Sequence, residues 1–337
     1  MPSRLIVALL FCAFVQKGSV NPKLLAPPDP AFQLPARDLR VTSSTATEVP
    51  SFGFFGAPQC DKDGELFFHL NKGSLNTMEV LKLRFVAGSA EPTVYQAPPT
   101  FTGDKSGGFF INWSVTPSGE FWMLGESRAR KYFLFKFNSE GTVTGETELA
   151  VPEHLDLRDF AVSDQGIVLV SGNFDHDATE GRADKRYVAL LSTFGKVQKE
   201  FDLKLDKVDL ETMDLHEGVA TYGEDGAFYV LGSQQVLVVS QSGTVQRRLS
   251  FDKPKDARAV HLAVSGGYLA IWLYKDNKDG PITTQFLLMD TSTGESLVLY
   301  NTTPETGNAG LCYSRKAGFT MWHEEDKRLK LLTANAN

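Results

Sequence analysis

The sequence is poor in the residues that mark several classes of protein. Its 337 residues include only three cysteines and six histidines, and the formal net charge is -7. The histidines are scattered, with no H-x-x-x-H or H-E-x-x-H pair, so no zinc motif is present. Because a polyanion binder needs a concentrated Lys/Arg surface, the acidic balance predicts that nucleic acid is not a partner.

Motifs of nucleophilic and nucleotide chemistry are also missing. There is no G-x-S-x-G elbow, and neither Cys60 nor Cys312 has a histidine close in sequence. No glycine motif follows a strand and opens a helix to hold a phosphate. We therefore expect a protein that is not an enzyme, although a triad assembled in space would leave no trace of this kind.

Long apolar runs are scarce. The run "LIVALLFCAFV" (5–15) is shorter than the roughly 20 residues that a membrane span requires. It follows a short basic start and precedes the small, polar "QKGSV", which predicts a signal peptide over residues 1–20, with a retained N-terminal anchor as the alternative. We expect export to the periplasm or the extracellular space, and no stable membrane span beyond this segment.

The next stretch differs in composition. "NPKLLAPPDPAFQLPARD" (21–38) contains five prolines, a density that favours an extended tether. Residues 21–37 are therefore predicted to form a linker, and residues 38–337 the folded domain.

Glycine and phenylalanine are plentiful, at 29 and 24 residues, and no segment carries a sustained 3.6-residue apolar stripe. A turn before an alternating apolar strand recurs through the chain. Its glycines are Gly64, Gly119, Gly166, Gly226 and Gly267, and Ala317 takes the glycine's place in a sixth copy. The spacings of 55, 47, 60, 41 and 50 residues are typical of four-stranded propeller blades.

Each copy has the same internal order. An apolar strand precedes the turn, a second apolar strand follows it, and a third strand ends in another glycine turn before a more polar fourth strand. Strands that are apolar on both faces belong inside a radial sheet, and half-polar strands belong at its rim. The sequence predicts an all-β, six-bladed propeller of four-stranded antiparallel blades.

The last copy is one strand short, whereas "RDLRVTSSTATEV" (37–49) is strand-like and has no blade of its own. We predict that this N-terminal strand completes the last blade and closes the ring, which removes two exposed sheet edges.

The phrase "FAVSDQGIVLVSG…YVALLSTFGKV" is similar to the repeats of six-bladed propellers of the NHL and TolB-like type, over residues 38–337. NHL repeats usually have an acidic residue at the end of the second strand, where this chain has "LG", "SG" and "IW". The resemblance therefore implies the fold and no particular activity.

Calcium-dependent lactonases of the gluconolactonase type share the six-bladed fold and hold one cation on the axis. The densest acidic stretch here, "NFDHDATEGRAD" (173–184), lies in one loop and lacks the spacing of a calcium loop, so a solvated loop is the favoured interpretation. We predict no metal site and no cofactor. Calcium would be required only if the protein were a hydrolase of the lactonase type.

Cys60 and Cys312 fall on the first strands of the first and last copies, which would be neighbours in a closed ring. They are a disulfide candidate in an exported protein, and two buried thiols are the alternative.

A ligand site is expected at the mouth of the central channel, where the links between blades meet. The residues predicted there are Asn112, Arg158, Asp159, His216, Arg258, His261 and Asn308. Arg158 and Arg258 start first strands in the third and fifth blades, so the closed ring would turn two cations toward one axis and favour an acidic ligand.

Three functions follow from these observations. The first is an exported binding or scaffold propeller without enzymatic activity, whose partner is a small acidic ligand or a protein. The second is a metal-dependent lactonase-like hydrolase. The third is a module that recognises carbohydrate or cell-wall material. Exposure of Trp122, Trp272 and Trp322 on the surface would support this function.

Overall fold

The computed structural model describes residues 34–47, 53–71, 79–86, 89–96, 98, 101, 107–178, 185–201, 219–275, 283–303, 311–325 and 328–335. Within these ranges the chain forms 25 β-strands. No helix in these ranges is long and apolar enough to cross a membrane. The His216 and Asn308 positions lie outside the described residues, as do residues 1–33.

The strands form six sheets, here called blades and numbered along the chain. Blade one contains β3 (Gly53–Cys60), β4 (Leu66–Asn71), β5 (Glu79–Val86) and β6 (Ser89–Gln96). Blade two contains β7 (Gly108–Val115), β8 (Phe121–Ser127), β9 (Tyr132–Phe137) and β10 (Val143–Leu149). Blade three contains β11 (Leu155–Val162), β12 (Val168–Phe174), β13 (Arg186–Leu191) and β14 (Val197–Glu200).

The second half of the ring repeats this order. Blade four contains β15 (Ala220–Tyr222), β16 (Ala227–Leu231), β17 (Gln235–Ser240) and β18 (Val245–Ser250). Blade five contains β19 (Arg258–Ser265), β20 (Tyr268–Lys275), β21 (Thr283–Asp290) and β22 (Ser296–Asn301), with β1 (Ala36–Asp38) as a fifth strand. Blade six contains β23 (Leu311–Ser314), β24 (Gly318–Glu325), β25 (Arg328–Asn335) and β2 (Arg40–Thr47).

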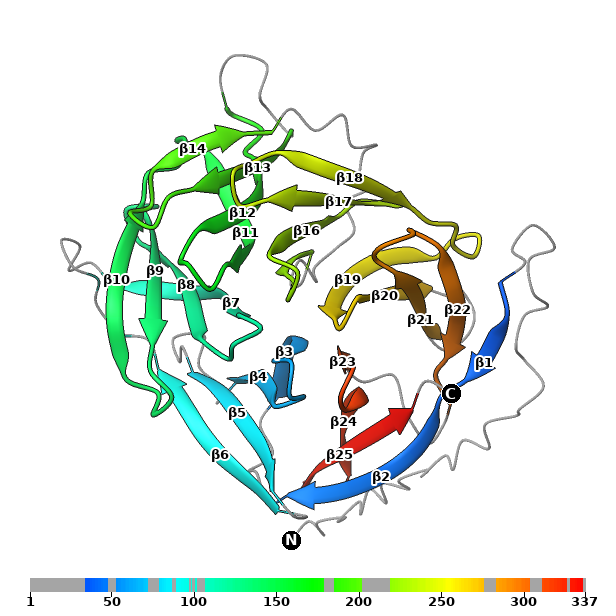
Figure 1. Cartoon of the computed structure of the whole chain (residues 1–337). Coiled ribbons are helices and arrows are strands. Elements are labelled where there is room, and N and C mark those ends of the chain that lie inside the picture. The colour runs from blue at the N-terminus through cyan, green and yellow to red at the C-terminus, as the bar shows by residue number, and fades with distance from the viewer. Residues whose placement is uncertain are drawn as a thin grey trace, which may run out of the picture.

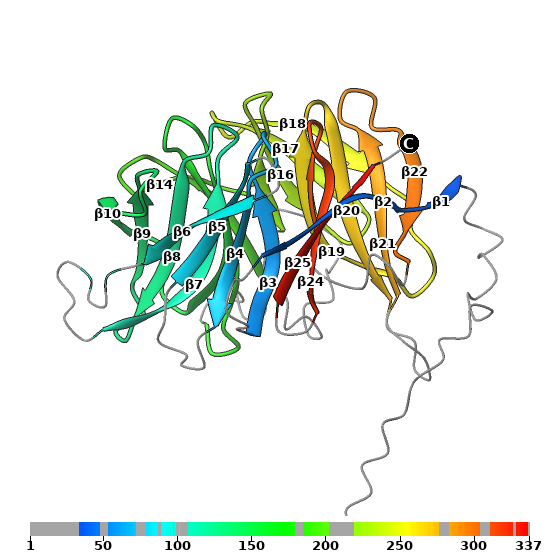
Figure 2. The same cartoon turned by 90° about the horizontal axis from the view of Figure 1, so that it is seen from below.

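The blades surround a central axis, with the first strand of each blade innermost (Figure 1). These first strands contact one another in the order β3, β7, β11, β15, β19, β23 and back to β3. Seen from the side, the strands run between the two faces of the ring (Figure 2). The predicted β-propeller is confirmed.

Burial follows the predicted gradient from axis to rim. The third strand β9 has five of its six residues buried, whereas the fourth strand β10 has only Leu149 buried. The apolar faces pack between neighbouring blades. Five buried clusters fill the interfaces from blades one and two to blades five and six. A blade therefore has no core of its own, and the stability of each depends on its neighbours.

The turn that joins the first and second strands of a blade is here called the inner turn. Its predicted glycines in blades one to five have φ between 77° and 87°, in the left-handed region. In blade six the prediction was wrong by one residue. Gly318, with φ of 76°, occupies the left-handed position, and Ala317 precedes it. An alanine at that φ would be strained, and the glycine next to Ala317 takes the left-handed position instead.

The predicted ring closure is present. Strand β2 pairs antiparallel with β25 and completes blade six from the N-terminal side. Strand β1 adds a feature that was not predicted, because it pairs parallel with the outer strand β22 of blade five. The Leu299 amide donates to the Pro35 carbonyl over 3.0 Å. Pro35, inside the stretch predicted as linker, thus already bonds to the propeller, because the open edge of β22 offers hydrogen-bonding partners.

Residues 34–47, here called the N-terminal strap, therefore hold the outer edges of two successive blades. At the junction of blades six and one, Cys60 and Cys312 form a disulfide with Cα atoms 5.8 Å apart. Gly64 approaches this junction so closely that an added Cβ would lie 2.6 Å from the Cβ of Ala317.

Candidate functional site

A pocket lies on the propeller axis. Its wall is built from the first strands β3, β7, β15, β19 and β23 and from the inner turns that follow β3, β7 and β15. It therefore opens on the face of the ring that carries the inner turns, here called the turn face. The pocket is open to solvent at its mouth. The side chains of this wall that could bind or react with a ligand are Asp61, Lys62, Tyr222, Glu224, His261, Ser265 and Tyr313.

Asp61 starts the inner turn of blade one and caps it. Its Oδ1 accepts hydrogen bonds from the amides of Asp63 and Glu65, both over 3.0 Å. The corresponding residue of blade three, Ser163, uses its hydroxyl oxygen in the same way. Thr116 caps the turn of blade two. Such caps replace hydrogen bonds that the bent backbone cannot make to itself.

Asp61 is almost completely buried, with 7% of the residue exposed. This burial raises its pKa above the ordinary value of 3.8, outweighing the amide hydrogen bond from Glu65, which lowers it. Oδ2 accepts no hydrogen bond from any residue that the structure describes. It lies toward blade two, where a Cβ added to Gly119 would be 3.5 Å away. One carboxylate oxygen thus caps the turn, the other accepts no hydrogen bond from the described residues, and Asp61 is part of the pocket wall.

A polar network joins blades four, five and six on the turn face. The Ser265 hydroxyl donates to Glu224 Oε1 over 2.9 Å, and the Gly266 amide donates to the same oxygen over 3.1 Å. The Arg315 amide donates to the Ser265 oxygen over 3.1 Å. The Arg315 guanidinium also donates to the Gly266 carbonyl and lies over the Tyr268 ring. Ser265 and one oxygen of Glu224 are therefore engaged in linking blades.

The rest of the wall contains aromatic and weakly polar side chains. His261 is buried on β19, with its ring 6.2 Å from that of Trp272. The Tyr222 hydroxyl accepts a hydrogen bond from Gln241 over 2.7 Å. Burial raises the pKa of Tyr313 to about 12, so this phenol is neutral at physiological pH. These three rings therefore add no charge to the wall when His261 is neutral.

Two of the predicted mouth residues are paired inside the ring. Asn112 on β7 and Asp159 on β11 are both fully buried, and Asn112 Nδ2 donates to Asp159 Oδ1 over 2.7 Å. Asp159 Oδ2 accepts from the Ala220 amide over 2.6 Å, so the carboxylate joins blades two, three and four. Asn112 Oδ1 is engaged with the Trp113 amide. Their polar atoms are occupied within the fold, and neither residue lines the axial pocket.

The other predicted residues have different placements. Arg158 is about half exposed and forms an ion pair with Asp156 on the same strand. Arg258 stands at the start of β19 and is half-buried. These residues lie toward the opposite face of the ring, here called the link face, where the chain passes from one blade to the next. His261 is the described member of the predicted set that lines the axial pocket.

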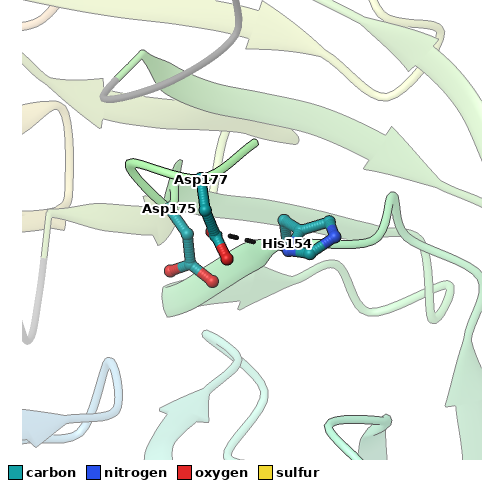
Figure 3. A group of neighbouring side chains, drawn as sticks. All are labelled: His154, Asp175 and Asp177. Atoms are coloured by element: carbon teal, nitrogen blue, oxygen red, sulfur yellow. Dashed lines mark ion pairs between the residues drawn. The ribbon is translucent and has the colours of Figure 1, made fainter. Parts of the chain in front are cut away.

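The structure also brings together His154, Asp175 and Asp177 on the link face (Figure 3). Their possible ligand atoms lie within 4.8 Å of one another. His154 Nδ1 is 3.5 Å from Asp177 Oδ1, and Asp175 is already paired with Arg130 over 3.1 Å. Asp177 is solvated as predicted for this loop, with 61% of its side chain exposed. The sequence did not predict that His154 lies next to Asp175 and Asp177, because 21 residues separate His154 from Asp175.

The pocket residues Asp61, Tyr222, Glu224 and Ser265 were not predicted from the sequence. One indication was available in the repeat. Asp61 is the only carboxylate at its position, where the other copies have Thr116, Ser163, Gly223, Ser265 and Ser314. The prediction placed the site at the link face, and this pocket opens at the other end of the channel.

Comparison with known proteins gives a likeness of fold. The sequence matches no protein-family model and no curated protein at a significant level. A gluconolactonase from Xanthomonas campestris is similar in structure, with a TM-score of 0.49, 15% identity, and coverage of 92% of this chain and 99% of that one. A luciferin-regenerating enzyme has a TM-score of 0.47, 10% identity, and coverage of 87% and 97%. A protein of unknown function from Bacteroides caccae has a TM-score of 0.44, 14% identity, and coverage of 74% and 87%.

Proposed function

We propose that this chain is an exported binding propeller without enzymatic activity, and that its ligand site is the axial pocket on the turn face. The observation that carries the proposal is the convergence of five blades on one open pocket that contains a buried carboxylate. One oxygen of this carboxylate accepts no hydrogen bond from the described residues. Concave sites on which polar groups from several elements converge are typical of ligand binding.

Binding is favoured over catalysis by what the reactive groups of the pocket already do. Cys60 and Cys312 are joined, and the Ser265 hydroxyl donates to Glu224. These groups hold neighbouring blades together, which leaves them poorly suited to act as nucleophile and base. The disulfide also supports export, since such bonds persist in oxidising compartments.

The alternatives make different demands. A lactonase-like hydrolase needs several oxygen ligands for a metal on the axis. The described group that could hold a cation lies instead at the link between blades two and three. A carbohydrate module needs exposed aromatic platforms, but Trp122 packs beneath Lys136 and Trp272 packs between His261 and Phe286. No specific observation favours either function.

The proposed acidic ligand at the link face rests on Arg158 and Arg258. Arg158 is partly neutralised by Asp156, which weakens the support for a paired-cation site. An anion held at this face would lose affinity in Arg158→Ala and Arg258→Ala variants. A ligand of the axial pocket would be insensitive to both changes.

A thermal-shift screen of the full chain tests the proposal. It should contain small amines, carboxylic acids, sugars, sugar lactones and divalent cations, with lactone hydrolysis followed in parallel. We expect at least one class to raise the melting temperature, and the effect to disappear in Ala263→Phe, which adds a ring to the wall of the pocket on β19. Val245→Phe, on the outer strand β18, adds the same ring away from the pocket and serves as the control. Stabilisation that survives Ala263→Phe, or lactone turnover that requires a metal, would overturn the proposal.

A further inference from the structure

We infer that the axial pocket binds an alkylammonium group, with Asp61 as its counter-ion. The inference rests on the proposed function, because the pocket must first be a binding site. It goes further by assigning the charge of the ligand and the residue that recognises it.

The negative charge of Asp61 is not needed for the turn that it caps. Asn138, at the end of β9, accepts hydrogen bonds from the amides of Glu140 and Thr142 over 3.1 and 2.9 Å. Asp61 makes the same pattern of bonds, to the amides two and four residues ahead. Ser163 shows that a hydroxyl suffices at the inner turn itself. A neutral residue could therefore replace Asp61 with no loss to the backbone.

The charge is instead unfavourable for the empty protein. The Asp61 carboxylate is buried, and desolvation is the largest influence on its pKa. Its surroundings compensate this cost only in part. Two backbone amides donate to Oδ1, and Lys82 and Lys316 attract the charge, but Glu65 repels it, and both lysines already pair with other carboxylates. A buried carboxylate whose burial is only partly compensated is stabilised when a cation arrives to pair with it.

The shape and chemistry of the wall favour an ammonium group over a metal ion. Calcium requires six to eight oxygen ligands, whereas the carboxylates of the described wall offer two oxygens that accept no hydrogen bond from the described residues, one on Asp61 and one on Glu224, beside the rings of Tyr222, Tyr313 and His261. Aromatic faces attract organic cations through their quadrupole. An alkyl chain would contact the apolar part of this wall, while its ammonium group donates to Asp61 Oδ2.

An ammonium group could belong to a small amine or to a lysine of a partner protein. Calorimetric titration of the full chain distinguishes these sources. The probes are n-butylammonium, its neutral isostere n-butanol, butyrate, a lysine-containing tripeptide, the same peptide with its amines acetylated, and calcium chloride. Binding of butylammonium alone assigns a small amine, and binding of the tripeptide at least tenfold more tightly than butylammonium assigns a protein partner.

The decisive variants are Asp61→Asn and Asp63→Asn. Asp63 lies in the same turn, but its side chain is exposed and pairs with Lys316, so its replacement removes a charge outside the pocket. We expect Asp61→Asn to weaken amine binding by at least about tenfold, and Asp63→Asn to leave it unchanged. The melting temperature of Asp61→Asn at neutral pH should equal or exceed that of the wild type. Asp61→Ser, which copies the Ser163 cap of blade three, repeats the test if the asparagine variant folds poorly.

The pH dependence gives an independent measure. The groups around Asp61 are Lys62, Asp63 and Glu65 on its own turn, Lys82 on β5, Tyr95 on β6, Lys316 on the inner turn of blade six, and Glu224, His261 and Tyr313 across the pocket. Protonation of Asp61 removes the counter-ion, so amine affinity should fall as the pH is lowered through the raised pKa of this group. In Asp61→Asn the amine affinity should no longer fall as the pH is lowered through this range.

Several outcomes would overturn the inference. These are equal amine binding by wild type and Asp61→Asn, equal binding of butanol and butylammonium, or calcium binding that displaces the amine. If another class of ligand is sensitive to Ala263→Phe but not to Asp61→Asn, the pocket is a binding site and the ammonium assignment is wrong. If no probe is sensitive to Ala263→Phe, the proposed function itself fails.

Discussion

Asn112 and Asp159 lie on the innermost strands of neighbouring blades, and the Asn112 amide donates to the Asp159 carboxylate over 2.7 Å in a fully buried position. The same carboxylate accepts from the Ala220 amide at the start of blade four. One side chain therefore fixes three successive blades around the axis.

Replacing Asp159 with alanine should destabilise the ring strongly. The change leaves the Ala220 amide buried without its acceptor and takes from Asn112 Nδ2 the shorter of its two bonds, the other being to the Arg158 carbonyl, which costs about 2–4 kcal/mol of unfolding free energy. Ser118→Ala is the matched control, because it removes an exposed 2.7 Å bond to Asp164 between blades two and three. We expect less than about 1 kcal/mol there. Denaturant unfolding measures both, and similar losses would contradict the role given to Asp159.

The disulfide should stabilise the closed ring. It joins residues 252 positions apart, so its loss releases a long loop in the unfolded state. Reduction, or Cys60→Ser with Cys312→Ser, should lower the unfolding free energy by about 2–5 kcal/mol. Non-reducing mass analysis of the native, exported chain should find neither of these thiols free. Two thiols that can be alkylated without unfolding would contradict this.

Removing the N-terminal strap, residues 34–47, should open the ring. The deletion exposes the edges of β22 and β25 and takes away Leu39, which is 2% exposed in the core between blades five and six. We expect aggregation, or a melting temperature lower by on the order of 10 °C. A chain that begins at residue 34 retains both strands and is the control. An unchanged melting temperature after the larger deletion would refute the closure.

Gly64 should be less replaceable than Gly267, although both are inner-turn glycines. Their φ values are 84° and 83°, so alanine carries the same backbone strain of about 1–2 kcal/mol at either site. At Gly64 the new Cβ would also meet Ala317 at 2.6 Å, whereas nothing lies within 4 Å at Gly267. Gly64→Ala should therefore lower the melting temperature more than Gly267→Ala. Equal effects would mean that blades one and six can separate slightly without loss.

The repeat made much of this fold predictable. Glycine turns at regular intervals, followed by alternating apolar strands, define blades through local chemistry alone, and the missing strand of the last copy pointed to β2. The parallel strand β1 was not predictable in this way. It is three residues long and rests on an edge supplied by residues more than 250 positions away. Its sequence, "ARD", carries no strand pattern.

The site was predictable only in part. First strands were expected to line the axis, and His261 does so. Whether a polar side chain on such a strand faces the channel or a neighbouring blade depends on local register. The register of β7 against β8 shifts between Phe110 and Asn112, and that of β11 against β12 shifts between Leu157 and Asp159. The side chains of Asn112 and Asp159, which follow these shifts, bond between blades and do not line the pocket. The role of Asp61 was not predicted, because an aspartate that caps a turn is common in sequences. Asp61 is buried by residues of other blades, which lie far along the chain.

Hydrogen exchange of the full chain, with and without a saturating lysine-containing tripeptide or butylammonium, tests the central claim most directly. The account predicts slower exchange at the amides of residues 59–65, 220–224, 261–265 and 312–314, and no such change in Asp61→Asn. Protection confined to the link face, around residues 154–158, or an identical response from Asp61→Asn, would contradict it.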